Sequence, residues 1–270
     1  MRRRWFIPLS TLVLVIASVA VGTSAAASSP LARPRAAHSP LPVHVAQPGG
    51  PVANMLRPHV SPANHSASNA TSTNWSGYAA TGSTYTSVSA NWTEPSVTCS
   101  SGNQYSSFWV GLDGDGSNTV EQTGSEADCS GSTPQYYSWY EMYPAAPVNF
   151  PNPVSPGDHM TGSVTYNGGS SFTLKLSDTT RGWSQTVNQS LTGASLASAE
   201  VIVEAPSSFT GVLPLADFGT VNFNGSTVDG SQLSSFNPTE ITMVSSSGVQ
   251  EDTISALNGG SFSATWDSSG

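Results

Sequence analysis

The chain has 270 residues, of which 9% are charged, and a formal net charge of −9 at pH 7. Residues 1–70 hold six arginines and no acid, whereas residues 71–270 hold Lys175 and Arg181 against all 17 acids, a formal charge of −15. A nucleic-acid-binding domain needs a basic face, so this composition excludes that function; it suits an acidic medium, in which the acids become neutral and stop repelling one another.

Residues 1–27 have the pattern of a secretory signal peptide. Three arginines precede an apolar run from Trp5 to Val21, and Ser24–Ala27 provide the small residues of a cleavage site. The run is near the lower length limit for a membrane span, and no second span follows it. We therefore expect a secreted, extracellular protein with no membrane attachment once the signal is cleaved.

Residues 28–70 are rich in proline, alanine and serine, and they contain four of the five histidines. They show no sustained period of a strand or a helix. Such a segment cannot bury enough apolar surface to offset its ordering entropy. We interpret it as a disordered propeptide or linker, and its position alone leaves both possibilities open.

Residues 71–270 are predicted to form one all-β domain. Helical periodicity is absent, and short alternating runs recur between Gly, Pro, Asn and Asp residues. Many short strands at this spacing predict a β-sandwich or barrel. The runs are Thr86–Trp92, Ser107–Asp113, Gln135–Tyr143, Met160–Tyr166, Ser171–Leu176, Glu200–Glu204, Gly219–Phe223, Glu240–Val244 and Ser261–Trp266.

The two cysteines, Cys99 and Cys129, are expected to pair in an oxidising compartment. In the chain-entropy model the loop that they close is worth roughly 3–4 kcal/mol. A Cys–His metal site is not expected, because this part of the chain has one histidine, His159. The Asp113–Gly116 stretch lacks the rest of an EF-hand loop and is interpreted as a turn. We expect no metal and no cofactor.

Strand alternation sorts side chains onto two faces. In Glu200–Glu204 both glutamates and Ile202 share one face, and the two valines are expected in the core. In the run Gln135–Tyr143, the side chains of Trp139, Glu141 and Tyr143 share a face. An acid between two large aromatics is more typical of a substrate groove than of a solvated surface.

The run Ser107–Asp113 follows the same rule. Trp109 and Asp113 share one face, whereas Phe108, Val110 and Leu112 share the other. Gln122 lies two residues before a glycine that lets another backbone approach closely. For these strands the alternative is an outward polar face with scattered aromatics, or a sugar-binding platform.

The available residue types exclude several chemistries. A Ser-His-Asp triad needs a positioned basic histidine, and the only one available is His159, which follows a turn. A cysteine nucleophile is excluded if the disulfide forms. Carboxylates, amides and aromatics remain, and these residue types suit hydrolysis in acid.

Five motifs in this order resemble the glutamic peptidases, also called eqolisins, and the resemblance covers most of residues 73–223. Each motif is weak alone, but five in order at similar spacing are specific. They are Asn74–Tyr78, Phe108–Gly114, Val120–Gly124, Trp139–Pro144 and Ala199–Glu204.

The resemblance implies a β-sandwich of two long, curved antiparallel sheets, with the substrate across the concave face. It implies an acid endopeptidase made as a preproprotein, which acts on protein or peptide substrates; we expect a monomer. Carried over residue by residue, the catalytic pair is Gln122 and Glu204. The substrate-binding residues implied are Trp109, Asp113, Trp139, Glu141 and Tyr143.

The chain also departs from the family pattern. Tyr137 stands where an acid precedes the Trp-Tyr-Glu motif. Glu126, with Asp128 beyond it, stands where an Asp follows the glutamine, and Val201 replaces an aromatic residue. These differences bear on the support of Gln122 and on subsite preference, and they leave the pair intact.

The expected mechanism uses Glu204 as general base, with a pKa near the ordinary value of about 4.3, and Gln122 as the group that stabilises the oxyanion. Two alternatives remain open at this point. One is a jelly-roll glycoside hydrolase that uses Glu141 and Glu204. The other is a non-catalytic carbohydrate-binding module.

Overall fold

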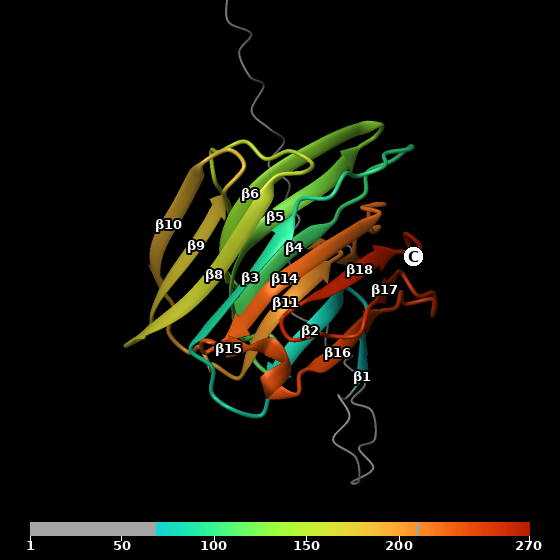
Figure 1. Cartoon of the computed structure of the whole chain (residues 1–270). Helices are drawn as coiled ribbons and strands as arrows, with labels where there is room; N and C mark the ends of the chain where they lie inside the picture. Colours follow the sequence, from blue (N-terminus) through green and yellow to red (C-terminus); the bar gives the residue numbers. More distant parts are fainter. Residues whose placement is uncertain (1–68, 209–210) are drawn as a thin grey trace, which may run out of the picture. The chain divides into compact units, whose positions relative to one another are not determined.

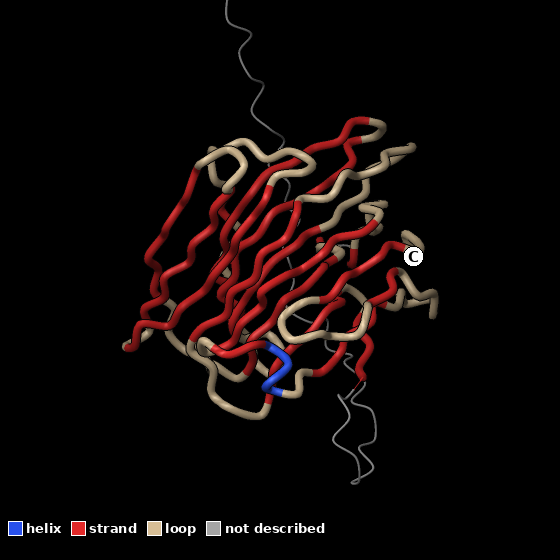
Figure 2. The backbone as a smooth tube through the Cα atoms, viewed as in Figure 1, coloured by secondary structure: helices blue, strands red, loops and turns tan. Residues whose placement is uncertain are grey.

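Strands dominate the computed structural model, which describes residues 69–208 and 211–270. The predicted signal peptide and residues 28–68 of the predicted propeptide or linker lie outside the described residues. The one helical segment in the described part is a short 3₁₀ turn, η1 (Leu233–Phe236). None of the described helical structure is long and apolar enough to cross a membrane. Figure 2 shows how the strands are joined by turns and loops.

The strands form two large sheets, seen as two layers in Figure 1. In order, the first sheet contains β1 (Asn69–Ser72), β16 (Thr239–Met243), β2 (Trp75–Thr81), β11 (Ser198–Glu204), β4 (Ser107–Leu112), β5 (Val120–Ser130), β6 (Thr133–Tyr143) and β7 (Val148–Asn149). The second contains β10 (Trp183–Ser190), β9 (Ser171–Asp178), β8 (His159–Gly168), β3 (Ser87–Thr93), β14 (Thr220–Val228), β18 (Phe262–Trp266) and β17 (Asp252–Ile254). Strand β15 (Ser231–Gln232) pairs with β14, and β12 (Ser207–Ser208) pairs with β13 (Gly211–Val212).

The predicted all-β sandwich is confirmed, and its sheets are antiparallel with one exception. At the edge of the first sheet β1 pairs with β16 in parallel, from Asn69 opposite Glu240 to Ser72 opposite Met243. Strand β1 starts two residues before the predicted start of the domain. The folded part includes Asn69 and Ala70, which lie before the expected boundary at residue 71.

The core between the sheets contains the residues that alternation assigned to it. Phe108, Val110 and Leu112 of β4 and Val201 and Val203 of β11 are fully buried there. They pack in one cluster with residues of the second sheet, among them Val164, Leu174 and Phe223. Each such buried side chain stabilises the fold by about 1.5–3 kcal/mol.

The predicted disulfide is confirmed. Cys99, in the loop after β3, is bonded to Cys129 near the end of β5, with a Cα–Cα distance of 5.4 Å. The bond joins the loop that leaves the second sheet to a central strand of the first. It therefore restrains β5, the strand that carries Gln122.

Candidate functional site

The register of β11, β4, β5 and β6 arranges the predicted site residues in cross-strand rows on one face of the first sheet. Directly paired residues of neighbouring strands point to the same face. From β11 to β6, the three rows are Glu200, Gly111, Gln122, Glu141; Ile202, Trp109, Gly124, Trp139; and Glu204, Ser107, Glu126, Tyr137. Gln122 and Glu204 therefore share a face, opposite the core between the sheets.

A second apolar cluster lies on this face and confirms the sequence-based assignment of side chains. It contains Trp109, Trp139 and Ile202, together with Trp75 of β2, and Tyr143 packs against it. The rings of Trp75 and Trp109 meet edge to face, with centroids 4.9 Å apart. The aromatic side chains thus form the floor on which the polar groups of the site are held.

Two glycines make room for the indole of Trp109. A Cβ atom at Gly124 would lie 2.3 Å from the Phe108 carbonyl oxygen and 2.6 Å from Trp109 Cβ. A Cβ at Gly111 would lie 2.9 Å from Trp109 Cζ3 and 3.2 Å from Gln122 Cβ. The indole therefore fills the side-chain space above Gly111 and extends toward Gln122.

Glu204 accepts hydrogen bonds on both carboxylate oxygens. Trp109 Nε1 donates to Oε2 at 2.9 Å, and Asn74 Nδ2 donates to Oε1 at 3.1 Å. The Ser72 hydroxyl donates to Asn74 Oδ1 at 3.1 Å and so turns the amide nitrogen toward Glu204. An indole N–H and an amide NH₂ can only donate, so both favour the ionised form of Glu204.

Burial acts against these donors. Glu204 is fully buried, and desolvation raises its pKa well above the ordinary value, with the nearby Glu141 carboxyl adding to the increase. The hydrogen bonds from Trp109 and Asn74 lower the pKa by less. This differs from the ordinary pKa expected from the sequence, because the face that carries Glu204 is apolar and shielded from solvent.

Gln122 is held by Glu141, its partner across the β5–β6 pair. Gln122 Nε2 donates to Glu141 Oε2 at 2.6 Å. Both residues are fully buried, and within the described part of the chain Gln122 Oε1 and Glu141 Oε1 have no hydrogen-bond partner. Burial raises the pKa of Glu141 to about 8. The pair thus presents unfilled hydrogen-bonding positions to a ligand.

The loop after β4 folds over the same face. A Cβ at Gly114 would lie 2.6 Å from Trp75 Cη2 and 3.0 Å from Val120 Cγ2, and this glycine has a φ of +109°. Trp75 pairs with Glu204, whereas Val120 lies two residues before Gln122. Their meeting at Gly114 shows that side chains from opposite ends of these strands converge on one region.

Asp113 has different neighbours from the other predicted site residues. Its carboxylate accepts hydrogen bonds from the backbone N–H groups of Ser195, Leu196 and Ala197 at 2.8–2.9 Å. It therefore holds the loop that leads into β11, and its oxygens are occupied. This arrangement fits a structural role better than the substrate contact expected from the sequence.

The structure also shows the contacts of residues that were not among the predicted site residues. Asn74 and Trp75 lie in the first quoted motif, but only the fold shows that Asn74 contacts Glu204. Glu126 lies in the row of Glu204, and burial raises its pKa well above the ordinary value. The Asp128 carboxylate accepts a hydrogen bond from the Tyr137 hydroxyl at 2.8 Å. In residues 69–208 and 211–270, no His, Cys, Asp or Glu cluster could hold a metal ion.

Comparisons with known proteins identify the family of the chain. A model of the peptidase A4 family matches residues 73–265. Aspergillopepsin-2 of Aspergillus niger is 29% identical over 226 residues, which cover 72% of this chain and 78% of that protein. Scytalidopepsin B of Scytalidium lignicola is 33% identical over 172 residues, which cover 61% of this chain and 59% of that protein.

Among solved structures, a crystal structure of scytalido-glutamic peptidase with a peptide-based transition state analogue superposes with a TM-score of 0.61. The identity is 27%, and the match covers 72% of this chain and 98% of the other. The matched proteins are peptidases. They support the peptidase interpretation over the glycoside hydrolase and the carbohydrate-binding module.

Proposed function

This chain belongs to the peptidase A4 family of glutamic peptidases and is a peptide-bond hydrolase; from that premise we propose a secreted acid endopeptidase in which Glu204 and Gln122 activate water. One observation carries the proposal. Glu204 is a buried carboxyl with donors on both oxygens, and it shares a face with a buried glutamine whose amide oxygen has no partner in the described part of the chain.

The proposed reaction begins with Glu204 ionised and a water held by Gln122 Oε1. Glu204 takes a proton from the water, whose oxygen attacks the carbonyl carbon of the scissile peptide. Gln122 Nε2 has a second hydrogen that is not given to Glu141, and it donates to the developing oxyanion. Protonated Glu204 then passes its proton to the leaving nitrogen as the C–N bond breaks. No acyl-enzyme forms.

Glu141 keeps Gln122 in the orientation that this reaction requires. Glu141 raises the pKa of Glu204, and two neighbouring carboxyls of this kind do not ionise together. Glu204 has two donors and Glu141 has one. In the proposed active form the negative charge is on Glu204, where these donors stabilise it, and Glu141 keeps its proton.

The raised pKa changes the working range expected from the sequence. At pH 3–4 most Glu204 side chains are protonated and cannot act as a base, so activity should rise as the pH increases from 3 through the pKa of Glu204. The upper limit is set by ionisation of Glu141 and the other buried carboxyls near pH 7–8. The proposed optimum is mildly acidic.

Digestion of denatured casein from pH 2 to pH 7, with the full chain and its processed form, tests the proposal. The wild type should cut casein on the acid side of pH 7, with pepstatin present or absent, because no aspartic dyad takes part. Glu204→Gln and Gln122→Ala should remain folded and lose nearly all activity. Cleavage of a polysaccharide in place of casein would contradict the proposal.

A further inference from the structure

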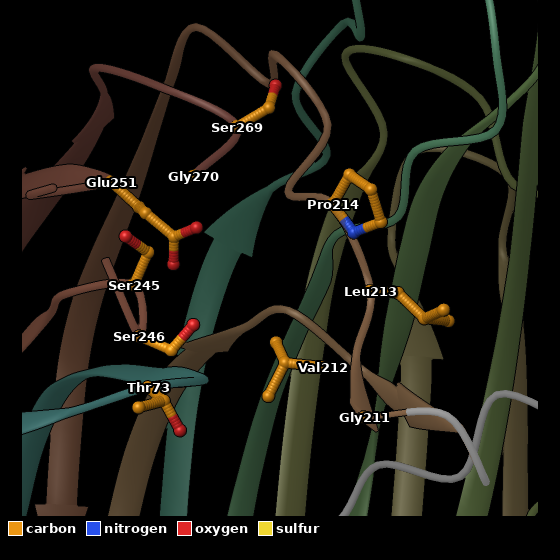
Figure 3. A pocket seen from close by; sticks show the side chains of 10 residues that line it. All are labelled: Thr73, Gly211, Val212, Leu213, Pro214, Ser245, Ser246, Glu251, Ser269 and Gly270. Atoms are coloured by element: carbon orange, nitrogen blue, oxygen red, sulfur yellow. The ribbon is translucent and has the colours of Figure 1, made fainter. Parts of the chain in front are cut away.

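A cavity of about 470 Å³ lies at the end of the first sheet where β2 begins and where β11 and β16 end. Its wall is built by Thr73 before β2, by Gly211–Pro214 after β12, by Ser245 and Ser246 after β16, by Glu251 before β17, and by Ser269 and Gly270 after β18, of which Gly270 lies against Glu251 Oε1. Figure 3 shows Val212, Pro214, Ser246 and Glu251 around a common space. The site described above does not account for this cavity.

The cavity combines apolar side chains with an unsatisfied carboxyl group. Val212, Leu213 and Pro214 line one side. On the other side the carboxyl of Glu251 points into the space (Figure 3), although this residue is only 3% exposed. Within the described part of the chain, Glu251 Oε2 and Thr73 Oγ1 are buried without hydrogen-bond partners. Leaving such a group unpaired is costly, so the position favours a ligand that donates hydrogen bonds.

The cavity adjoins the proposed catalytic carboxyl through both of its nearest walls. Thr73 immediately precedes Asn74, whose amide donates to Glu204. On the other wall, the backbone N–H of Leu213 donates to the Pro206 carbonyl at 2.9 Å, two residues after Glu204. A peptide bound beside Glu204 therefore has the cavity within reach of one of its side chains.

We propose that this cavity is a substrate subsite for a lysine or arginine side chain, with Glu251 as its specificity-determining residue. The inference rests on the proposed function. The aliphatic stem would pack on Val212 and Pro214, and the cationic end would donate to Glu251 Oε2. The two cations of the described part do not fill the cavity: Lys175 lies on β9, and Arg181 pairs with Asp158.

The charge state of Glu251 gives the subsite a pH dependence. Burial, followed by the neighbouring Asp252, raises the pKa of Glu251 to about 7. Asp252 adjoins it on β17, and Asp267 follows β18, where its N–H donates to the Glu251 carbonyl. A bound cation favours the ionised carboxyl. Discrimination in favour of lysine should therefore increase from pH 4 to pH 6.

The test uses one cleavable peptide in which a single lysine is moved from four positions before the scissile bond to four positions after it. Leucine and glutamine peptides serve as references. At one of these positions, kcat/KM at pH 6 should be about tenfold higher for the lysine peptide than for the leucine peptide. At pH 4 this ratio should be smaller. Glu251→Gln should abolish this preference, so that the lysine and leucine peptides are cut with equal kcat/KM.

Asp217→Asn, an acid outside the cavity, is the matched control and should keep the lysine preference. If Glu251→Gln does not fold, Ser246→Phe fills the same cavity from a turn and should also remove the preference. Equal rates for lysine and leucine at every position, or a preference that persists in Glu251→Gln, would overturn the subsite. Failure to cut any peptide would instead contradict the proposed function.

Discussion

At the scale of single residues, Glu204 is subject to two opposing effects. Burial removes water from its carboxyl and raises its pKa, whereas Trp109 and Asn74 donate hydrogen bonds that stabilise the charge. The result is a stronger base than an exposed glutamate, available as carboxylate only above strongly acidic pH. The catalytic strength of this site therefore depends on the balance between the apolar floor and its two donors.

Trp109→Phe tests the hydrogen bond that Trp109 Nε1 donates to Glu204. The phenyl ring keeps much of the packing but loses the indole N–H, so the pKa of Glu204 should rise further. A hydrogen bond to a charged group is worth about 1.5–3 kcal/mol. We expect kcat/KM at pH 5 to fall by about tenfold or more, and the acid limb of the pH profile to move to higher pH. Steady-state kinetics with one peptide measures both.

Trp139→Phe is the matched control. Trp139 lies on the same floor and is equally buried, but its Nε1 has no hydrogen-bond partner among the described residues. Its loss should leave the acid limb where the wild type has it. An equal shift in the two variants would show that packing, and not the donor to Glu204, sets the pKa.

The sequence predicted which residues share the face, because period-two alternation depends only on local order. Trp109, Trp139 and Glu141 lie where alternation assigned them. The pKa of Glu204 and the partners of Asp113 could not be predicted in this way. Both depend on segments far apart in sequence, the loop at residues 195–197 in the case of Asp113.

At the scale of elements, alternation identified strands only where one face is apolar. All nine predicted runs coincide with strands of the structure. Strand β10 was missed because it is a polar edge strand whose residues alternate only between partly buried and exposed. Only the start of β5 was considered, because its polar residues are buried on both faces and show no alternation. The parallel β1–β16 pairing depends on a contact between distant segments.

Strand β5 also shows how closely the site is packed. Gly124→Ala would place a methyl group 2.3 Å from the Phe108 carbonyl oxygen and 2.6 Å from Trp109 Cβ. We expect a loss of at least about 2 kcal/mol in the free energy of unfolding. Urea denaturation would measure the loss, and activity should fall as Trp109 moves.

The control for this variant is Gly131→Ala in the turn after β5. That glycine has a φ of +60°, and a Cβ there would meet nothing within 4 Å. Its substitution should cost only about 1 kcal/mol, from the left-handed backbone conformation. Equal losses at both positions would mean that crowding beneath Trp109 is unimportant.

At the scale of the whole domain, many acids are buried with raised pKa values. Glu94 shows the effect between the sheets, where Ser125 donates to its carboxyl and burial raises its pKa to about 8. The other groups whose pKa is raised to about 7 or 8 are Glu121, Asp128, Glu141, Glu251 and Asp252. The acidic composition therefore reflects carboxyls that the fold holds in their neutral form.

The domain should be most stable at acid pH. Between about pH 4 and pH 7 the unfolded chain loses protons that the folded chain keeps, so the free energy of unfolding falls as the pH rises. Each such group contributes up to about 1.4 kcal/mol per pH unit. Melting temperatures from pH 4 to pH 8 should fall steadily, and less steeply in Glu94→Gln. A melting temperature that rises from pH 4 to pH 8 would contradict the raised pKa values of these buried carboxyls.

The pH dependence of kcat/KM for one peptide, in the wild type, Glu204→Gln and Glu141→Gln, tests the central claim most directly. The wild type should show an acid limb with a midpoint above pH 4.5. Glu141→Gln should leave that midpoint in place, because Glu141 still holds its proton while Glu204 ionises, and should weaken the loss of activity near pH 8 that ionisation of Glu141 causes. The kcat/KM of Glu204→Gln should be about 10³-fold or more below that of the wild type at every pH, and its melting temperature should be unchanged. A folded Glu204→Gln that keeps substantial activity, or an acid limb that Glu141→Gln moves to lower pH, would contradict the account.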